Sequence, residues 1–178
     1  MQVTKIIKFI FLPVALLSMN AFSSEKFVGI DYKYLNYNPV GAHEKISAAA
    51  INLEFLFNEY YSTEIYVGSG LNKVNLKSEL SEIEVDIGLL WGISFKAQYP
   101  ASDRFSLYAK AGYNEVTGRA EALDYNISST DTESDQLYGL GFSFEIKKNN
   151  QLYIEYASYI HDSQIEFDGV SIGCKYKI

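Results

Sequence analysis

Residues Tyr138–Ile146, with the sequence YGLGFSFEI, decide the fold class. Large apolar side chains alternate in this stretch with glycine, serine and glutamate. A period of two places all the bulky side chains on one face of a β-strand and all the small or charged ones on the other. The stretch Val170–Ile178, VSIGCKYKI, repeats the arrangement. These segments predict strands with two chemically different faces.

The same alternation recurs along the chain after residue 23, and helical periodicity is absent there. A tilted strand that crosses a bilayer needs about 9 to 11 residues, whereas strands of globular proteins are about half that long. The alternating runs have the longer, membrane-crossing length. They are Phe27–Tyr37, Ile46–Phe57, Tyr61–Leu71, Ile83–Phe95, Arg104–Asn114, Gln136–Ile146, Gln151–Ile160 and Phe167–Ile178.

The connections between the runs alternate between short and long. Turns are expected at Asn58–Tyr60, Ala97–Asp103 and Lys147–Asn150. Polar loops are expected at Asn38–Lys45, Asn72–Glu82, Glu115–Asp135 and His161–Glu166, with Ser128–Asp135 mobile. Short turns at one end and longer loops at the other are typical of outer-membrane barrels. The pattern predicts an all-β, eight-stranded antiparallel transmembrane up-and-down β-barrel, with four loops outside the cell and both termini in the periplasm.

The position of the glycines indicates which face meets lipid. Ten glycines occupy the same alternate positions of the strands as the charged residues, a set that we call one parity because it lies on one face. Glycine in a strand is tolerated where space is short. The lumen of an eight-stranded barrel is just wide enough for side chains, so we assign this parity to the lumen. The lumen charges are Asp31, Lys33, Glu54, Glu64, Glu84, Asp86, Lys110, Glu145, Glu155, Lys175 and Lys177. The lipid-facing residues include Ile30, Ile51, Phe55, Ile83, Val85, Ile87, Leu89, Trp91, Phe142 and Ile172.

A soluble barrel with an apolar interior would show the same period, and it remains an alternative. Two observations favour the membrane barrel over the soluble one: the glycines share a face with the charged residues, and the face with the bulky apolar residues carries no charge. A lysine or arginine on the lipid face costs roughly 2 to 4 kcal/mol at mid-bilayer. We therefore expect Leu89→Arg to block insertion or greatly reduce stability.

The N-terminal residues have the pattern of an export signal. Lys5 and Lys8 precede an apolar run, Phe9–Leu17, and small residues suit a cut after Ser23. We expect residues 1–23 to be a signal peptide and residues 24–178 to form one barrel domain. The net charge of −7 argues against a nucleic-acid partner. A single cysteine and two histidines predict no disulfide, metal site or cofactor.

Four segments resemble the small OmpA/OmpX-type outer-membrane barrels. They are Leu107–Tyr113 (LYAKAGY), Tyr138–Ile146, Leu152–Tyr156 (LYIEY) and Val170–Ile178. The resemblance covers the chain from residue 24 onward and implies location in a bacterial outer membrane, with its lipids and insertion machinery as partners. Members usually end in Phe or Trp, whereas this chain ends in Ile178. We expect this departure to affect how the insertion machinery recognises the last strand.

No residue is assigned a catalytic role. His161-Asp162-Ser163 resembles the His-x-Ser of outer-membrane lipid A deacylases. The Asn expected after the serine is Gln164, and the acidic position further on is Lys175. A lipid-modifying enzyme is therefore a minor alternative to a polar loop.

The lumen acids allow two interpretations. Glu64, Asp86, Glu145 and Glu155 either line an ion path or pair with Lys33, Arg104, Lys110 and Lys175. We favour the paired network because small barrels are normally filled. The expected function is non-enzymatic: a structural or adhesive role in which the loops meet an extracellular ligand or host surface. A narrow channel or carrier for small solutes is the alternative.

Overall fold

The computed structural model describes residues 25–39, 44–77, 82–122, 127–161 and 165–178. The expected signal peptide, residues 1–23, lies outside them. None of the described residues belongs to a helix long and apolar enough to cross a bilayer. The strands are β1 Glu25–Pro39, β2 Glu44–Leu56, β3 Tyr61–Gly70, β4 Val74–Lys77, β5 Glu82–Pro100, β6 Phe105–Ala122, β7 Ile127–Lys147, β8 Asn150–His161 and β9 Ile165–Lys177.

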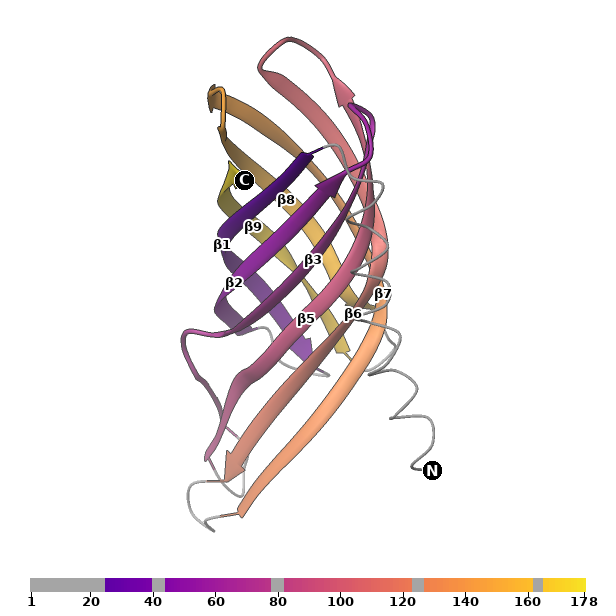
Figure 1. Cartoon of the computed structure of the whole chain (residues 1–178). Helices are drawn as coiled ribbons and strands as arrows, with labels where there is room; N and C mark the ends of the chain where they lie inside the picture. The colour runs from indigo at the N-terminus through magenta and orange to yellow at the C-terminus, as the bar shows by residue number, and fades with distance from the viewer. Residues whose placement is uncertain (1–24, 40–43, 78–81, 123–126, 162–164) are drawn as a thin grey trace.

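The strands form one closed antiparallel barrel (Figure 1). Apart from β3 and β4, each strand pairs with its neighbour in sequence, β1 pairs with β9, and β3 pairs with β5. Strands β3 and β4 both pair with β5 and are interrupted at Leu71–Lys73, so together they make one barrel strand. The barrel therefore has eight strands, as the sequence predicts. Closure satisfies the backbone donors and acceptors without water, as hydrocarbon requires.

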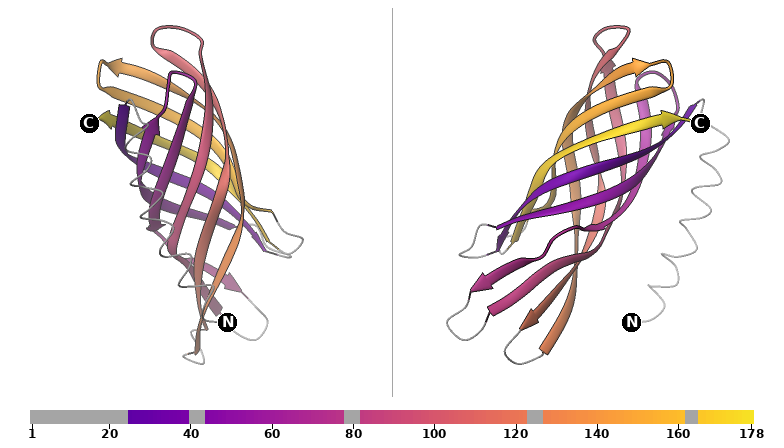
Figure 2. Two further views of the ribbon diagram at one scale, coloured as in Figure 1. Left: turned by 45° about the vertical axis from the view of Figure 1, so that its right-hand side comes forward. Right: turned by 90° about the vertical axis from the view of Figure 1, so that its left-hand side faces the viewer.

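Tight turns close the end of the barrel that carries the C-terminus (Figure 1). In one of them the Asn58 side chain accepts hydrogen bonds from the backbone N–H groups of Tyr60 (2.8 Å) and Tyr61 (2.9 Å). Strand β1 also begins here, since the Ile178 amide donates to the Lys26 carbonyl. The opposite end carries long hairpins that project past the rest of the barrel (Figure 2). We refer to the turn end as periplasmic and the hairpin end as extracellular, following the usual arrangement.

The two faces of the barrel have the polarity expected from the sequence. On the outer face, Ile51 is 57% exposed and Ile172 is 52% exposed, whereas the lumen side chain of Lys33 is 2% exposed. Trp91 and Phe142 belong to the outer face as well. Phe55 differs from the prediction, because it shares the outer parity but is only 6% exposed.

A β-bulge in β5 overturns part of the face assignment. The register with β6 shifts between Ile87 and Leu89, which makes Gly88 the extra residue. Beyond it, Ile87 pairs with Gly118 and is buried, so Ile83, Val85 and Ile87 turn inward instead of facing lipid. Glu84 and Asp86 correspondingly leave the lumen face and pair with the outward residues of β6.

Two of the expected loops are largely strand. Val116 to Ala122 pair with Glu133 to Ile127, so β6 and β7 continue as a hairpin through most of Glu115–Asp135. Strand β4 likewise pairs with the start of β5 inside Asn72–Glu82. The expectation that Ser128–Asp135 forms a loop was therefore wrong. Serine, threonine and aspartate usually favour loops, but the hydrogen-bond ladder with β6 holds this exposed segment in a strand.

Candidate functional site

Four carboxylates and four lysines fill the middle of the lumen. Each of these residues is 5% exposed or less, and they project from every barrel strand except β7. Equal numbers of opposite charges make the cluster formally neutral, which offsets the cost of removing them from water. We call this set the lumen network. Its members are Asp31, Lys33, Glu54, Glu64, Lys96, Lys110, Glu155 and Lys175.

Glu64 is the centre of the lumen network. Its carboxylate lies 3.0 Å from Lys110 Nζ, 3.2 Å from Lys96 Nζ and 3.5 Å from Lys175 Nζ. Three lysines around one carboxylate would repel one another, but each of them has a second acidic partner. These further ion pairs are Lys96–Glu54 (3.1 Å), Lys110–Glu155 (2.7 Å) and Lys175–Glu54. A continuous set of alternating charges therefore crosses the lumen.

Asp31 organises a second, adjoining part of the network. Its carboxylate forms an ion pair with Lys33 (3.1 Å) and accepts hydrogen bonds from Tyr153 Oη (2.7 Å) and Asn52 Nδ2 (3.1 Å). Lys33 also donates to Tyr159 Oη at 3.3 Å. These contacts tie β1, β2 and β8 together across the lumen.

Tyrosine rings cover the lysines of the network. Lys96 Nζ lies 4.4 Å from the centroid of the Tyr108 ring, and Lys33 Nζ lies 5.0 Å from that of Tyr66. Cation–π contacts of desolvated groups are worth about 2 kcal/mol. The rings therefore stabilise the ammonium groups where water is excluded.

Each of three lumen tyrosines packs against a glycine on the adjacent strand. A Cβ at Gly92 would lie 2.6 Å from Tyr66 Oη, a separation that real Cβ atoms do not show. The glycines thus provide the room that the sequence analysis assigned to them. The cross-strand pairs are Tyr66–Gly92, Tyr108–Gly141 and Tyr153–Gly173.

The structure supports the paired network over an ion path, with changes in its membership. Glu64 and Glu155 pair with lysines as expected, including Lys110 and Lys175. The remaining expected members do not take part: Asp86 lies beyond the Gly88 bulge, Glu145 has no ion pair among the described residues, and Arg104 is in an exposed turn.

Lys96 is a network residue that the sequence analysis missed. The alternating run was ended at Phe95, although Lys96 continues the lumen parity by one residue. Extending the run to the turn at Ala101 would have found it. The barrel places the Lys96 ammonium between Glu54 and Glu64.

His161 and Lys175 are not brought together as a site. His161 is exposed at the end of β8, 3.9 Å from Glu166, and Ser163 lies outside the described residues. Lys175 is buried in the lumen network. Within the described ranges, no three His, Cys, Asp or Glu residues are placed to hold a metal ion.

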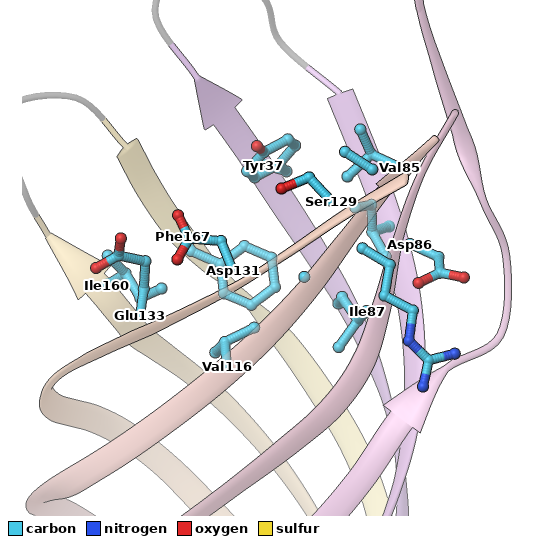
Figure 3. A pocket seen from close by; sticks show the side chains of 14 residues that line it. Tyr37, Val85, Asp86, Ile87, Val116, Ser129, Asp131, Glu133, Ile160 and Phe167 are labelled. Carbon is cyan, nitrogen blue, oxygen red and sulfur yellow. The ribbon is translucent and has the colours of Figure 1, made fainter. Parts of the chain in front are cut away.

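A cavity of about 190 Å³ opens at the extracellular end of the barrel (Figure 3). Its apolar wall comprises Ile46, Val85, Ile87, Val116, Ile160 and Phe167. The carboxylates of Asp131 and Glu133, on the inner face of the β7 extension, also line it. We call this cavity the extracellular cup. The bulge at Gly88 adds Val85 and Ile87 to the apolar wall because it turns them inward.

The fold and the filled lumen define a small transmembrane barrel of the bacterial outer membrane. The family model for the outer membrane protein beta-barrel domain matches residues 9–177, and the chain belongs to this family. The chain is located in the outer membrane, and its resemblance to the small OmpA/OmpX-type barrels is confirmed.

Solved structures of three small barrels resemble the chain. Ail, the attachment invasion locus protein of Yersinia pestis, is 14% identical with a TM-score of 0.66, over 88% of this chain and 99% of Ail. Neisserial surface protein A is 12% identical with a TM-score of 0.66, over 86% and 97%. OprG of Pseudomonas aeruginosa is 14% identical with a TM-score of 0.61, over 88% and 97%. No curated protein sequence matches the chain.

Proposed function

We propose that this protein is a non-enzymatic surface-recognition protein, anchored by its barrel and binding an extracellular partner through its projecting hairpins. The observation that carries the proposal is the unequal length of the strands. Strands β5, β6 and β7 contain 19, 18 and 21 residues, whereas about 9 to 11 suffice to cross the bilayer. The surplus residues extend beyond the membrane and present a surface there.

The projecting sheet has a free edge that suits recognition. Among the described residues, β7 pairs with β8 from Tyr138 onward, while Ile127 to Ser134 pair with β6 alone. The backbone groups along this edge are available to an added strand. The side chains of Ile127 to Ser134 are exposed as well.

The charge of the projecting sheet favours a cationic partner. Glu84, Glu121, Asp131 and Glu133 lie on it, and the basic residues at positions 73–86 and 115–135 are Lys73, Lys77 and Arg119. Ail was solved in complex with the heparin analogue sucrose octasulfate, a polyanion. A negatively charged sheet would repel such a ligand. We therefore propose a positively charged host or matrix protein as the partner.

The filled lumen argues against the channel alternative. Eight buried charges pair across the barrel axis, so a permeating ion would have to separate at least one of these pairs. We expect the folded protein to show no steady conductance in a planar bilayer. Open-channel steps from the wild-type protein would favour the channel over the recognition function.

The proposal is tested by shortening one hairpin. Residues 117–132 are replaced by Asn-Gly, a two-residue turn that suits the facing pair Val116 and Glu133. Cells that display the full chain and cells that display the shortened chain are compared for binding to immobilised matrix proteins of high and low pI. We expect selective binding to the basic proteins by the full chain alone, with equal amounts of heat-modifiable barrel in both outer membranes. Equal binding by both chains would refute the proposal.

We further propose that residues 1–23 are removed on export and that the insertion machinery assembles the barrel. The motivating features are the basic start, the apolar run and the small residues before Ser24. Intact mass measurement of the protein from purified outer membranes tests the cut. A mass that includes Met1 to Ser23 would exclude it.

A further inference from the structure

The extracellular cup combines an apolar interior with unpaired negative charge. We propose that it binds a small amphipathic amine, with the apolar group inside and the ammonium group at Asp131 and Glu133. This inference goes beyond surface recognition by the hairpins, because it concerns a small solute held on the inner side of the projecting sheet.

The size and lining of the cup set the apolar part of the ligand. Ile46, Ile87 and Phe167 are 1%, 4% and 2% exposed, so the cup extends into the packed interior rather than lying on the surface. A cavity of about 150 Å³ with an apolar lining holds benzene. The volume of about 190 Å³ therefore suits a phenyl ring with a short alkyl chain.

The charges around the cup select a cation. Asp131 and Glu133 lie on its inner side, facing Gly118 and Val116 of β6, whereas Asp86 and Arg119 are cross-strand partners on the outer face. Neither Asp131 nor Glu133 forms an ion pair with another described residue. Asp131 and Glu133 line the same cavity as Phe167 and Ile160 (Figure 3). An ammonium group attached to a ring in the cup would lie within reach of them.

The floor of the cup prevents passage into the barrel. Tyr159 packs against Phe167, with ring centroids 6.0 Å apart, and its hydroxyl accepts a hydrogen bond from Lys33 of the lumen network and shares another with Ser171 Oγ at 3.4 Å. Leu35, Leu90 and Leu137 are fully buried in the same cluster. The cup is thus a closed-ended binding site rather than the entrance of a pore.

Gly118 allows the cup to be filled without disturbing the backbone. A Cβ at this position would have one neighbour within 4 Å, the Asp86 carbonyl oxygen at 3.9 Å. Gly118→Phe therefore places a ring in the space assigned to the ligand. Thr117→Phe is the matched control, because Thr117 pairs with Leu89 and belongs to the outer face. Ala120→Leu, also in the lining, replaces Gly118→Phe if that variant fails to fold.

The test is isothermal titration calorimetry of the full chain in lipid nanodiscs, with empty nanodiscs as the reference for membrane partition. The probes are phenethylammonium, the neutral phenethyl alcohol and the anionic 3-phenylpropanoate. We expect saturable one-site binding in the order cation, alcohol, anion. Gly118→Phe should weaken phenethylammonium binding at least tenfold, and Thr117→Phe should leave it unchanged.

The carboxylates are tested separately from the cavity. The double variant Asp131→Asn with Glu133→Gln keeps the side-chain shapes. We expect it to weaken the binding of phenethylammonium about fivefold, an effect typical of removing partly exposed ion pairs. The binding of phenethyl alcohol should not change. The cup would be overturned as a site if phenethylammonium showed no saturable binding above that of empty nanodiscs. It would also be overturned if the Gly118→Phe variant bound phenethylammonium as tightly as the wild-type protein. Equal binding of the cation and the anion would overturn the assigned ligand class. None of these results depends on adhesion, which the shortened hairpin tests.

Discussion

Replacing Glu64 with glutamine is the most direct test of the lumen network. The carboxylate contacts three lysines, at 3.0, 3.2 and 3.5 Å. At an effective dielectric constant of about 20, one unit-charge pair at 3 Å is worth about 5 kcal/mol before desolvation is counted. Breaking a buried ion pair by removing one partner typically costs about 3 to 5 kcal/mol in net stability. Glutamine keeps the size and one acceptor oxygen, so we expect a loss of about 3 kcal/mol.

A paired substitution separates charge from shape in this test. Glu64→Gln leaves four lysines against three carboxylates, whereas Glu64→Gln with Lys96→Met restores equal numbers and leaves Lys110 paired with Glu155 and Lys175 paired with Glu54. We expect the double variant to recover at least 1 kcal/mol over Glu64→Gln alone. Neutral replacements of a complete buried pair are often tolerated, whereas an unpaired charge is not.

Urea unfolding in lipid vesicles measures these differences. Trp91 is the single tryptophan and belongs to the outer face, so its fluorescence reports the loss of the lipid environment without touching the lumen network. A free energy of unfolding for Glu64→Gln within 0.5 kcal/mol of wild type would refute the reasoning. So would a double variant less stable than Glu64→Gln alone.

Three further predictions concern packing, the lipid face and the hairpin. Gly92→Ala should destabilise the barrel by about 1 to 3 kcal/mol in the same assay, because its Cβ overlaps the Tyr66 ring; a neutral effect would contradict the packing argument. Ile172→Arg, at mid-bilayer, should lower the free energy of unfolding by roughly 2 to 4 kcal/mol, and Leu89→Arg, near the interface, should lower it by under about 1 kcal/mol. Urea unfolding measures both values, and equal losses would contradict the placement of the interface. Single alanine substitutions within 128–134 should leave heat-modifiable barrel unchanged on gels, since these side chains are exposed; loss of folded barrel would show that the segment supports the fold.

The smaller penalty at Leu89 revises the expectation from the sequence. Trp91, two residues nearer the periplasm, donates from Nε1 to the Glu115 carboxylate at 3.2 Å, and its ring lies 6.2 Å from that of Tyr113. A tryptophan that is apolar on one side and bonded to a carboxylate on the other is typical of a membrane interface. Leu89 therefore lies at the extracellular rim, where a charge costs little.

The barrel and its lipid face were predictable because one rule governs all the strands inside the bilayer. Alternation fixed the faces of residues such as Ile51, Lys110 and Ile172 without any knowledge of their partners. The partners themselves were not predictable. Which lysine meets Glu64 depends on the stagger of strands that are distant in sequence, and periodicity does not encode that stagger.

The extracellular cup was missed because the preferred polarity of a sheet reverses at the membrane surface. Within lipid the outer face must be apolar, whereas above lipid the outer face meets water and the inner face can be apolar. Strand β6 makes this change in its sequence: its inner residues pass from Lys110 and Asn114 to Val116, and its outer residues become charged at Glu115. The polar stretch Glu115–Asp135 therefore predicts a loop by composition, although its inner residues continue a strand.

Strand β5 meets the same requirement through its backbone. Its apolar parity continues unbroken from Phe95 to Ile83, so the outer residues of the membrane segment and the inner residues of the extension have the same parity. Only an odd register shift brings both segments to their correct faces, and the bulge at Gly88 supplies it. Strand β8 contains a comparable shift between Ser158 and Ile160, after which Ile160 turns into the cup. An alternating run that is too long for the bilayer and keeps one apolar parity therefore implies a bulge at the interface. The two bulges together bring Val85, Ile87 and Ile160 into the apolar wall of the cup.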